Sequence, residues 1–142
     1  MRFQYTPILL VILSSLCYHL FQKSTPANIN PIAALIITYA CALVVSIVAF
    51  FILSPKTNLI QSFGDANWAS FFLGLAVVGI ELGFLLVYRS GWNISSASLL
   101  SNTFVAILLI PIGLLLYKEK ISLTTIAGVI LCISGLILIS KR

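Results

Sequence analysis

The chain has 142 residues, of which 61% are hydrophobic and 8% are charged, and its mean hydropathy is +1.16. A soluble domain of this length cannot bury so much apolar surface, so the composition predicts an integral membrane protein. Eight basic residues against three acidic ones give a net charge of +5; they stand near the ends of the apolar runs, which favours lipid headgroup contacts and argues against a nucleic-acid surface.

Hydrophobic runs predict a single all-α domain over residues 1–142, a bundle of five transmembrane helices. The approximate spans are 7–22, 31–53, 68–88, 94–117 and 122–140. Each begins at a residue that can cap a helix, in chain order Thr6, Asn30, Asp65 or Asn67, Asn93 and Ser122. A polar loop is expected over residues 56–67. The runs lack the alternation of a membrane barrel, so strands are not expected.

The loop charges predict no single orientation in the membrane. Basic residues resist translocation, so their distribution usually indicates which loops stay in the cytoplasm. Five spans would place four basic residues on each side, namely Arg2, Lys56, Lys118 and Lys120 on the N-terminal side, and Lys23, Arg89, Lys141 and Arg142 on the other. This balance favours insertion both ways and an antiparallel dimer, with one fixed orientation as the alternative.

The sequence shows no sign of metal, cofactor or enzymatic chemistry. Cys17, Cys41 and Cys132 stand alone within apolar runs and are interpreted as small buried hydrophobic residues. No metal-ligand cluster, phosphate loop or paired nucleophile and base is apparent. We therefore expect no bound metal, no cofactor and no enzyme.

One carboxylate, Glu81, lies near the middle of the third span without an oppositely charged neighbour in the sequence. An ionised carboxylate at that depth costs about 2.5–3.5 kcal/mol on insertion scales, and such residues usually face the bundle interior or water. Gly79 and Gly83 form a GxxxG face that predicts close helix packing, whereas Gly74, Glu81 and Tyr88 recur on another face. Glu81 is interpreted as a proton-linked or cation-binding group; the alternative is a protonated acid that only hydrogen-bonds across helices.

The fourth span is the other polar one. Ser98 and Asn102 share a face with Ser95, where they would bind a solute or bond to neighbouring helices and their own backbone. Pro111 removes one backbone hydrogen bond from this span, which predicts a hinge or a purely structural kink.

Polar side chains also gather near the end of the first span, where Tyr18 and His19 are adjacent. His19 is a candidate proton relay to Glu81, because imidazole titrates near neutral pH; the alternative is a residue of the membrane interface. Tyr39, on the second span, is a weaker candidate for the same site.

The stretch from Gly79 to Ser140 resembles the last three helices of an EamA-type domain, the repeat unit of the drug/metabolite transporter superfamily. The resemblance rests on GFLLVYRSGWNISSASLLSNTFVAILL, on LLLYKEKIS, in which Glu119 closes the fourth span, and on TTIAGVILCISGLILIS. The first two helices match in pattern through LLVILSSLCYHLFQK and PIAALIITYA. It implies a five-helix unit that occurs twice in full-length relatives, as inverted repeats around a substrate path. Two antiparallel copies of this single unit would regenerate that architecture.

Together these features predict a small secondary transporter of the drug/metabolite type in the plasma (inner) membrane. It would move a small cationic or zwitterionic solute by alternating access in a dimer, with proton coupling through Glu81. Its expected partners are membrane lipids, the solute, and a second copy or a related small membrane protein. The alternatives are a lipid-linked flippase subunit in a heteromer and a non-transporting scaffold or assembly protein.

Overall fold

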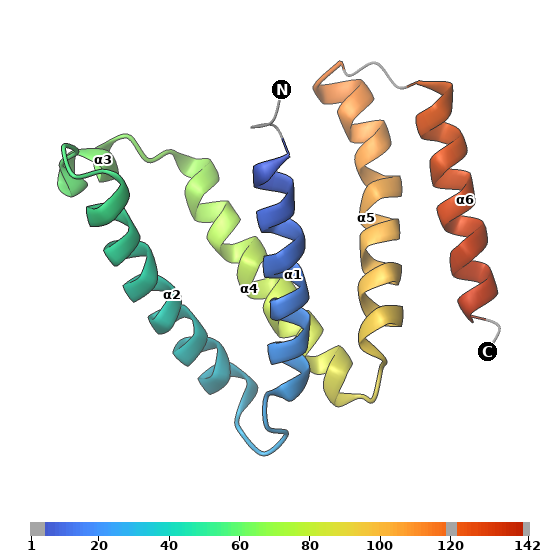
Figure 1. Cartoon of the computed structure of the whole chain (residues 1–142), viewed down its shortest axis with the longest axis horizontal. Helices are drawn as coiled ribbons and strands as arrows, with labels where there is room; N and C mark the ends of the chain where they lie inside the picture. The colour runs from blue at the N-terminus through green and yellow to red at the C-terminus, as the bar shows by residue number, and fades with distance from the viewer. Residues whose placement is uncertain (1–4, 119–121, 141–142) are drawn as a thin grey trace. The chain divides into compact units, whose positions relative to one another are not determined.

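The computed structural model describes residues 5–118 and 122–140, and every regular element in them is an α-helix (Figure 1). The all-α prediction is therefore confirmed. The helices are α1 (Thr6–Ser24), α2 (Pro31–Leu53), α3 (Leu59–Gly64), α4 (Trp68–Arg89), α5 (Ile94–Leu116) and α6 (Leu123–Ser140).

Four of these helices, α1, α2, α4 and α5, are long and apolar enough to cross a membrane. α6 contains a shorter apolar stretch, Thr124–Gly135, so its crossing as a fifth span stays a prediction. The chain divides into two compact units, Met1–Ser90 and Gly91–Arg142. The single domain expected over residues 1–142 stays a prediction. We call the two units the N-terminal unit and the C-terminal unit.

Local capping chemistry explains why several helices start where they do. The Asn30 side-chain oxygen accepts hydrogen bonds from the Ile32 and Ala33 amides at 2.8 and 3.4 Å, and Pro31 occupies the first helical position. The Asn67 oxygen accepts from the Ala69 amide at 3.0 Å, so Asn67 is the cap of α4.

Two of the expected caps differ. Thr6 is already the first residue of α1; Tyr5 occupies the cap position, with no side-chain hydrogen bond. Asn93 stands at the cap position of α5, but its side chain makes no capping bond. Ser122 does cap α6, since its hydroxyl accepts from the Thr125 amide at 3.1 Å.

The segment expected to be a loop, residues 56–67, contains the short helix α3. The Asn58 side chain accepts from the Ile60 amide at 3.0 Å and starts this helix. The helix has six residues and no buried side chain, so it carries too few turns for a periodic apolar pattern to reveal it.

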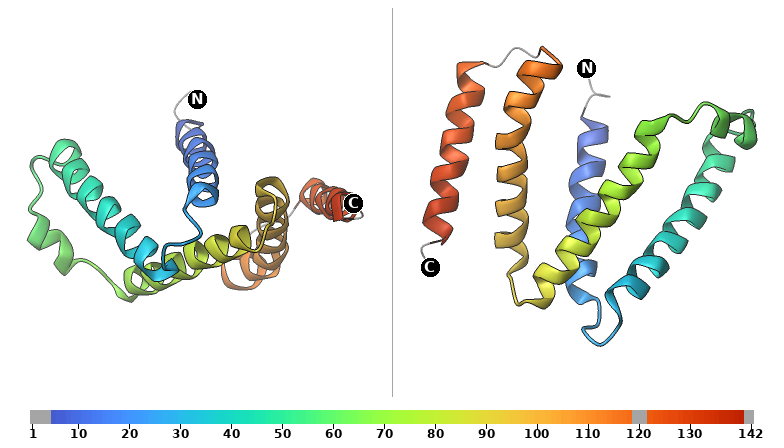
Figure 2. Two further views of the ribbon diagram at one scale, coloured as in Figure 1. Left: turned by 90° about the horizontal axis from the view of Figure 1, so that it is seen from below. Right: turned by 180° about the vertical axis from the view of Figure 1, so that it is seen from behind.

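In the N-terminal unit, α4 contacts both α1 and α2. α1 and α2 diverge from the loop that joins them, and α4 crosses α1 (Figure 2). The side chains buried in this unit are Leu35 on α2 and Leu85 and Tyr88 on α4. These buried side chains lie near the start of α2 and near the end of α4.

In the C-terminal unit, α5 contacts α6. α5 continues through Pro111 to Leu116 without a break, and Ala97, Thr103 and Gly113 are its buried residues. A hinge at Pro111 stays a prediction.

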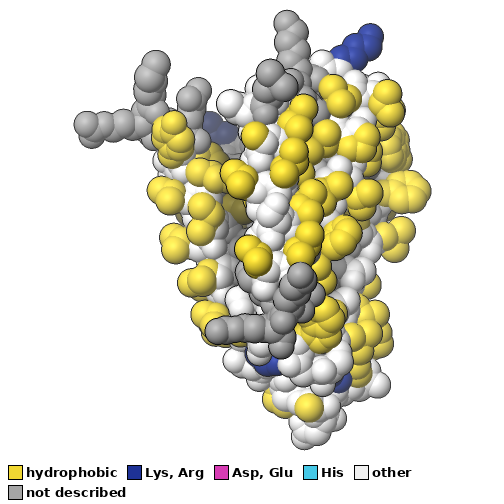
Figure 3. All heavy atoms as spheres, turned by 90° about the vertical axis from the view of Figure 1, so that its right-hand side faces the viewer, with side chains coloured by type: hydrophobic (Ala, Val, Ile, Leu, Met, Phe, Trp, Pro, Cys, Tyr) yellow, Lys and Arg dark blue, Asp and Glu magenta, His cyan; other side chains and the backbone are white. Residues whose placement is uncertain are grey.

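Most apolar side chains of the single chain are exposed, and the exposed set includes large residues of every membrane-length helix. Figure 3 shows a face on which hydrophobic side chains predominate and few lysine or arginine side chains are visible. Cys17, Cys41 and Cys132 are exposed as well, so the expectation that they are buried is wrong for one chain. This distribution is that of a protein whose surrounding solvent is lipid.

Candidate functional site

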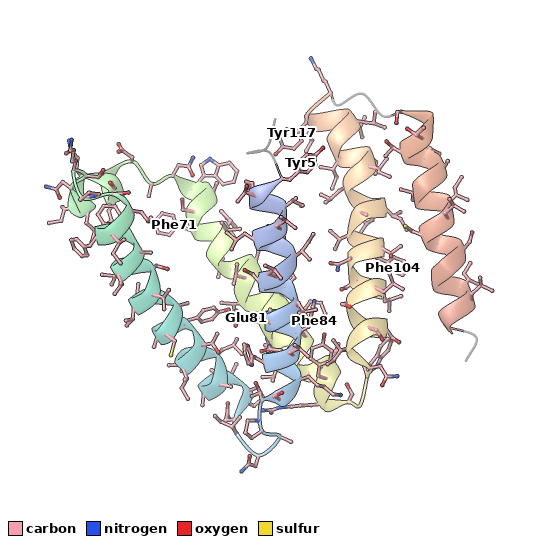
Figure 4. The ribbon with its side chains drawn as sticks, viewed as in Figure 1. Tyr5, Phe71, Glu81, Phe84, Phe104 and Tyr117 are labelled. Carbon is pink, nitrogen blue, oxygen red and sulfur yellow. The ribbon has the colours of Figure 1, made fainter. Side chains whose placement is uncertain are left out.

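Three helices of the N-terminal unit bring a polar and aromatic cluster together. We call it the Glu81 cluster; it consists of Tyr18, His19 and Gln22 from α1, Tyr39 from α2, and Glu81, Phe84 and Tyr88 from α4. Figure 4 shows Glu81 and Phe84 on α4 where this helix passes α1. Four residues singled out from the sequence, Tyr18, His19, Glu81 and Tyr88, thus lie in one place.

Glu81 is partly buried on α4, eight residues before the helix ends at Arg89. At 1.5 Å per residue this is about 12 Å from the end of the helix, which is deep within a hydrocarbon layer about 30 Å thick. A carboxyl group at this depth requires polar neighbours.

The Tyr39 hydroxyl lies beside the Glu81 carboxyl and interacts with it electrostatically. The two groups do not meet the geometry of a hydrogen bond, since the Tyr39 oxygen is buried without a hydrogen-bond partner among the described residues. The Tyr18 oxygen is in the same situation, and it interacts electrostatically with both Glu81 and Tyr39. Three oxygen-bearing groups from three helices therefore lie close to one another.

Direct hydrogen bonds hold α1 against α4 around these groups. The Gln22 side-chain amide donates to the backbone carbonyl of Glu81 at 2.7 Å. The Tyr88 hydroxyl and Nδ1 of His19 share a hydrogen bond of 2.8 Å. His19 thus bonds to Tyr88 instead of Glu81, so a proton relay from His19 to Glu81 would need an intermediate group.

Aromatic rings line the space between α1 and α4. Phe84 stacks on Tyr88 with centroids 5.8 Å apart and an interplanar angle of 28°. Phe84 also packs edge-to-face on Tyr18 at 6.0 Å and on His19 at 4.9 Å. Ring contacts therefore fix the positions of the side chains that carry the polar groups.

Two cationic side chains, Lys23 and Arg89, bind backbone carbonyls at the end of the unit that lies nearest the α1–α2 loop. Lys23 donates to the Tyr88 carbonyl at 3.3 Å, and its ammonium lies 5.6 Å from the centre of the Tyr88 ring. Arg89 Nη2 donates to the carbonyls of Pro26 and Ile29 at 3.1 and 2.9 Å. These bonds tie the last turns of α1 and α4 and the connecting loop together.

The remaining predicted site residues lie on α5, in the C-terminal unit. The Ser98 hydroxyl donates to the Ser95 carbonyl of its own helix at 3.3 Å, and Asn102 is exposed. A solute contact by either side chain stays a prediction. Glu119, which the resemblance placed at the end of the fourth span, lies outside the described residues.

Gly79 and Gly83 are exposed on α4, and a β-carbon built on either would meet no described atom within 4 Å. The close helix packing expected on this face stays a prediction.

Two members of the Glu81 cluster, Tyr39 and Phe84, do not stand out in the sequence, because each is a single aromatic residue in an apolar run. The available signal for Tyr39 was its hydroxyl near the middle of an apolar helix, since such a group needs a partner in lipid. Its proximity to Glu81 is a tertiary contact that no spacing rule reveals.

The residues described form no group of three or more His, Cys, Asp or Glu side chains that could hold a metal ion. The chemistry available to the Glu81 cluster is that of one carboxyl group, hydroxyl groups and aromatic rings. This set can bind a positively charged or hydrogen-bonding solute.

The family model described as the EamA-like transporter family matches residues 5–141. No match was found among curated proteins or among solved structures. The family match and the membrane-length helices together make the chain a multi-pass membrane protein of the transporter type. Because the match spans nearly the whole sequence, the chain belongs to the EamA-like transporter family.

Proposed function

We propose that the protein is a secondary transporter of a small cationic or zwitterionic solute, and that Glu81 binds the charged group of this solute. The observation that carries the proposal is the position of Glu81, partly buried at membrane depth beside two buried tyrosine hydroxyls that have no hydrogen-bond partner among the described residues. A carboxyl group kept at this depth is costly, so a charged ligand that compensates it accounts for its presence.

The charge distribution of the spans supports a cation over an anion. Between the helix ends, the described parts of α1, α2, α4 and α5 carry Glu81 and no lysine or arginine outside their last two residues. An anion at the same depth would meet no lysine or arginine of these helices. The same carboxyl group would couple transport to protons if it releases a proton when the solute binds.

Alternating access in a dimer forms the second part of the proposal. Two antiparallel copies in the plasma (inner) membrane would place two Glu81 clusters about a pseudo-twofold axis, an arrangement typical of transporters with inverted repeats. The balanced loop charges and the extensive exposed apolar surface support this assembly.

Uptake into proteoliposomes tests the proposal with four labelled probes: ethanolamine, choline, lysine and glycine betaine. We expect uptake of at least one probe above that of empty vesicles, and a loss of at least about tenfold in Glu81→Gln, because a buried charge pair is lost. Asp65→Asn is the matched control, since Asp65 is an exposed carboxylate outside the helices. An inward or outward pH gradient should change the rate in the wild type and not in Glu81→Gln.

Equal uptake by Glu81→Gln and the wild type at every pH would remove the acid from the mechanism. Uptake no greater than in empty vesicles for all four probes would favour the non-transporting scaffold. Each variant is first checked for correct size and helical content in detergent.

A further inference from the structure

The oxygen atoms of the Glu81 cluster bear on which type of cation the site can bind. The hydroxyls of Tyr18 and Tyr39 are buried and have no hydrogen-bond partner within the described chain. Each interacts electrostatically with Glu81, and Tyr18 also interacts with Tyr39. The three groups come from three different helices, α1, α2 and α4.

A buried hydroxyl without a partner is unfavourable, and a ligand that supplies hydrogen-bond donors or acceptors would remove this cost. A hydroxyl oxygen has two acceptor lone pairs, and a carboxylate only accepts. The cluster therefore presents acceptors to a bound group. A primary ammonium carries three N–H donors, whereas a quaternary ammonium carries none.

The aromatic rings, which would recognise a quaternary ammonium, are largely engaged with one another. Lys23 lies over the Tyr88 ring at 5.6 Å, and Phe84 stacks against the same ring at 5.8 Å. Phe84 presents further contacts to Tyr18 and His19. The Tyr88 ring thus already contacts a cation and a second ring, whereas the Tyr18 and Tyr39 hydroxyls have no hydrogen-bond partner among the described residues.

We infer that the Glu81 cluster selects a primary ammonium group. The carboxylate of Glu81 and the hydroxyl oxygens of Tyr18 and Tyr39 accept hydrogen bonds from its three N–H groups. The inference rests on the proposed function and narrows its substrate class. Tyr18 and Tyr39 are the specificity-determining residues, and Glu81 supplies the charge. A free amine and the headgroup of phosphatidylethanolamine both carry this group.

Binding of a methylation series tests the selectivity. The probes are ethanolamine, N,N-dimethylethanolamine and choline, which share one carbon skeleton and one charge and differ in their N–H donors. Their affinities are measured by calorimetry with the full chain in phosphatidylglycerol nanodiscs, which contain no amine. We expect affinity to fall in that order, by about fivefold for each lost hydrogen bond. Equal affinities, or tighter binding of choline, overturn the inference.

Variants separate the inference from the proposed function. Tyr18→Phe and Tyr39→Phe, which remove one oxygen each, should lower the ratio of ethanolamine to choline affinity by about fivefold. Tyr5→Phe is the matched control, because Tyr5 is 70% exposed at the other end of α1. Glu81→Gln should weaken both probes. If Glu81→Gln weakens both probes and the wild type does not prefer ethanolamine, the inference fails and the proposed function stands.

If neither probe depends on Glu81, both proposals fail. Repeating the ethanolamine titration in nanodiscs that contain phosphatidylethanolamine identifies the source of the group. Competition by the lipid, seen as weaker ethanolamine binding, supports a headgroup ligand. Unchanged binding supports a free amine.

Discussion

The Tyr88 hydroxyl lies 2.8 Å from Nδ1 of His19 and joins α4 to α1. Tyr88 is 4% exposed, and its carbonyl and its ring both contact Lys23. The last turn of α4 is therefore attached to the last turns of α1 through the hydroxyl, the backbone and the aromatic face of one residue.

The hydrogen bond between His19 and Tyr88 should be measurable as a coupling energy. In a double-mutant cycle of His19→Ala and Tyr88→Phe, we expect a coupling of about 0.5–1.5 kcal/mol in the free energy of unfolding in micelles. Tyr5→Phe, an exposed tyrosine on the same unit, should change stability by less than about 0.5 kcal/mol. Additive effects of the two substitutions would mean that the hydrogen bond contributes nothing to the α1–α4 contact.

The contacts of Arg89 depend on the shape of its side chain as well as on its charge. Nη2 donates to two carbonyls of the α1–α2 loop, and a lysine ammonium at this position would keep the charge without the planar donor group. We expect Arg89→Lys to speed hydrogen exchange of loop amides over residues 25–30, while its membrane orientation stays that of the wild type.

Arg89→Gln removes the charge as well. It should speed the same exchange and also shift the orientation measured by a C-terminal reporter, because one basic residue leaves that side. Slow exchange retained in Arg89→Lys would show that one donated bond is sufficient to hold the loop.

Much of the fold follows from local chemistry, whereas the site depends on how helices meet. The caps Asn30 and Asn67 follow from residue type and position, since each satisfies amides of the first helical turn. The common face of Glu81 and Tyr88 follows from helical periodicity. By contrast, the proximity of Tyr39 to Glu81 depends on how α2 meets α4, and no sequence separation encodes that contact.

The balance of loop charges predicts that orientation is easily shifted. Lys56 is exposed between α2 and α3. Lys56→Gln leaves three basic residues on its side against four on the other, so the side with four should be retained in the cytoplasm more often. With five spans, this places the C-terminus in the cytoplasm more often.

A C-terminal reporter that is active on either side of the membrane measures this shift. We expect signal from both sides in the wild type and a larger cytoplasmic fraction in Lys56→Gln. Signal from one side in both proteins would rule out the antiparallel homodimer.

The GxxxG face of α4 offers a test of the dimer that leaves the single chain intact. A β-carbon added at Gly79 or Gly83 meets no described atom of the same chain within 4 Å, so we expect Gly79→Leu and Gly83→Leu to retain the helical content of the wild type. If a second copy packs on this face, the larger side chain separates the two backbones and costs about 1–3 kcal/mol of association free energy. Energy transfer between labelled copies in liposomes measures this loss.

Gly64→Leu, at an equally open position at the end of α3, should associate as the wild type does. Unchanged association of the Gly79 and Gly83 variants would mean that these glycines face lipid, and the copies would then have to meet through another surface.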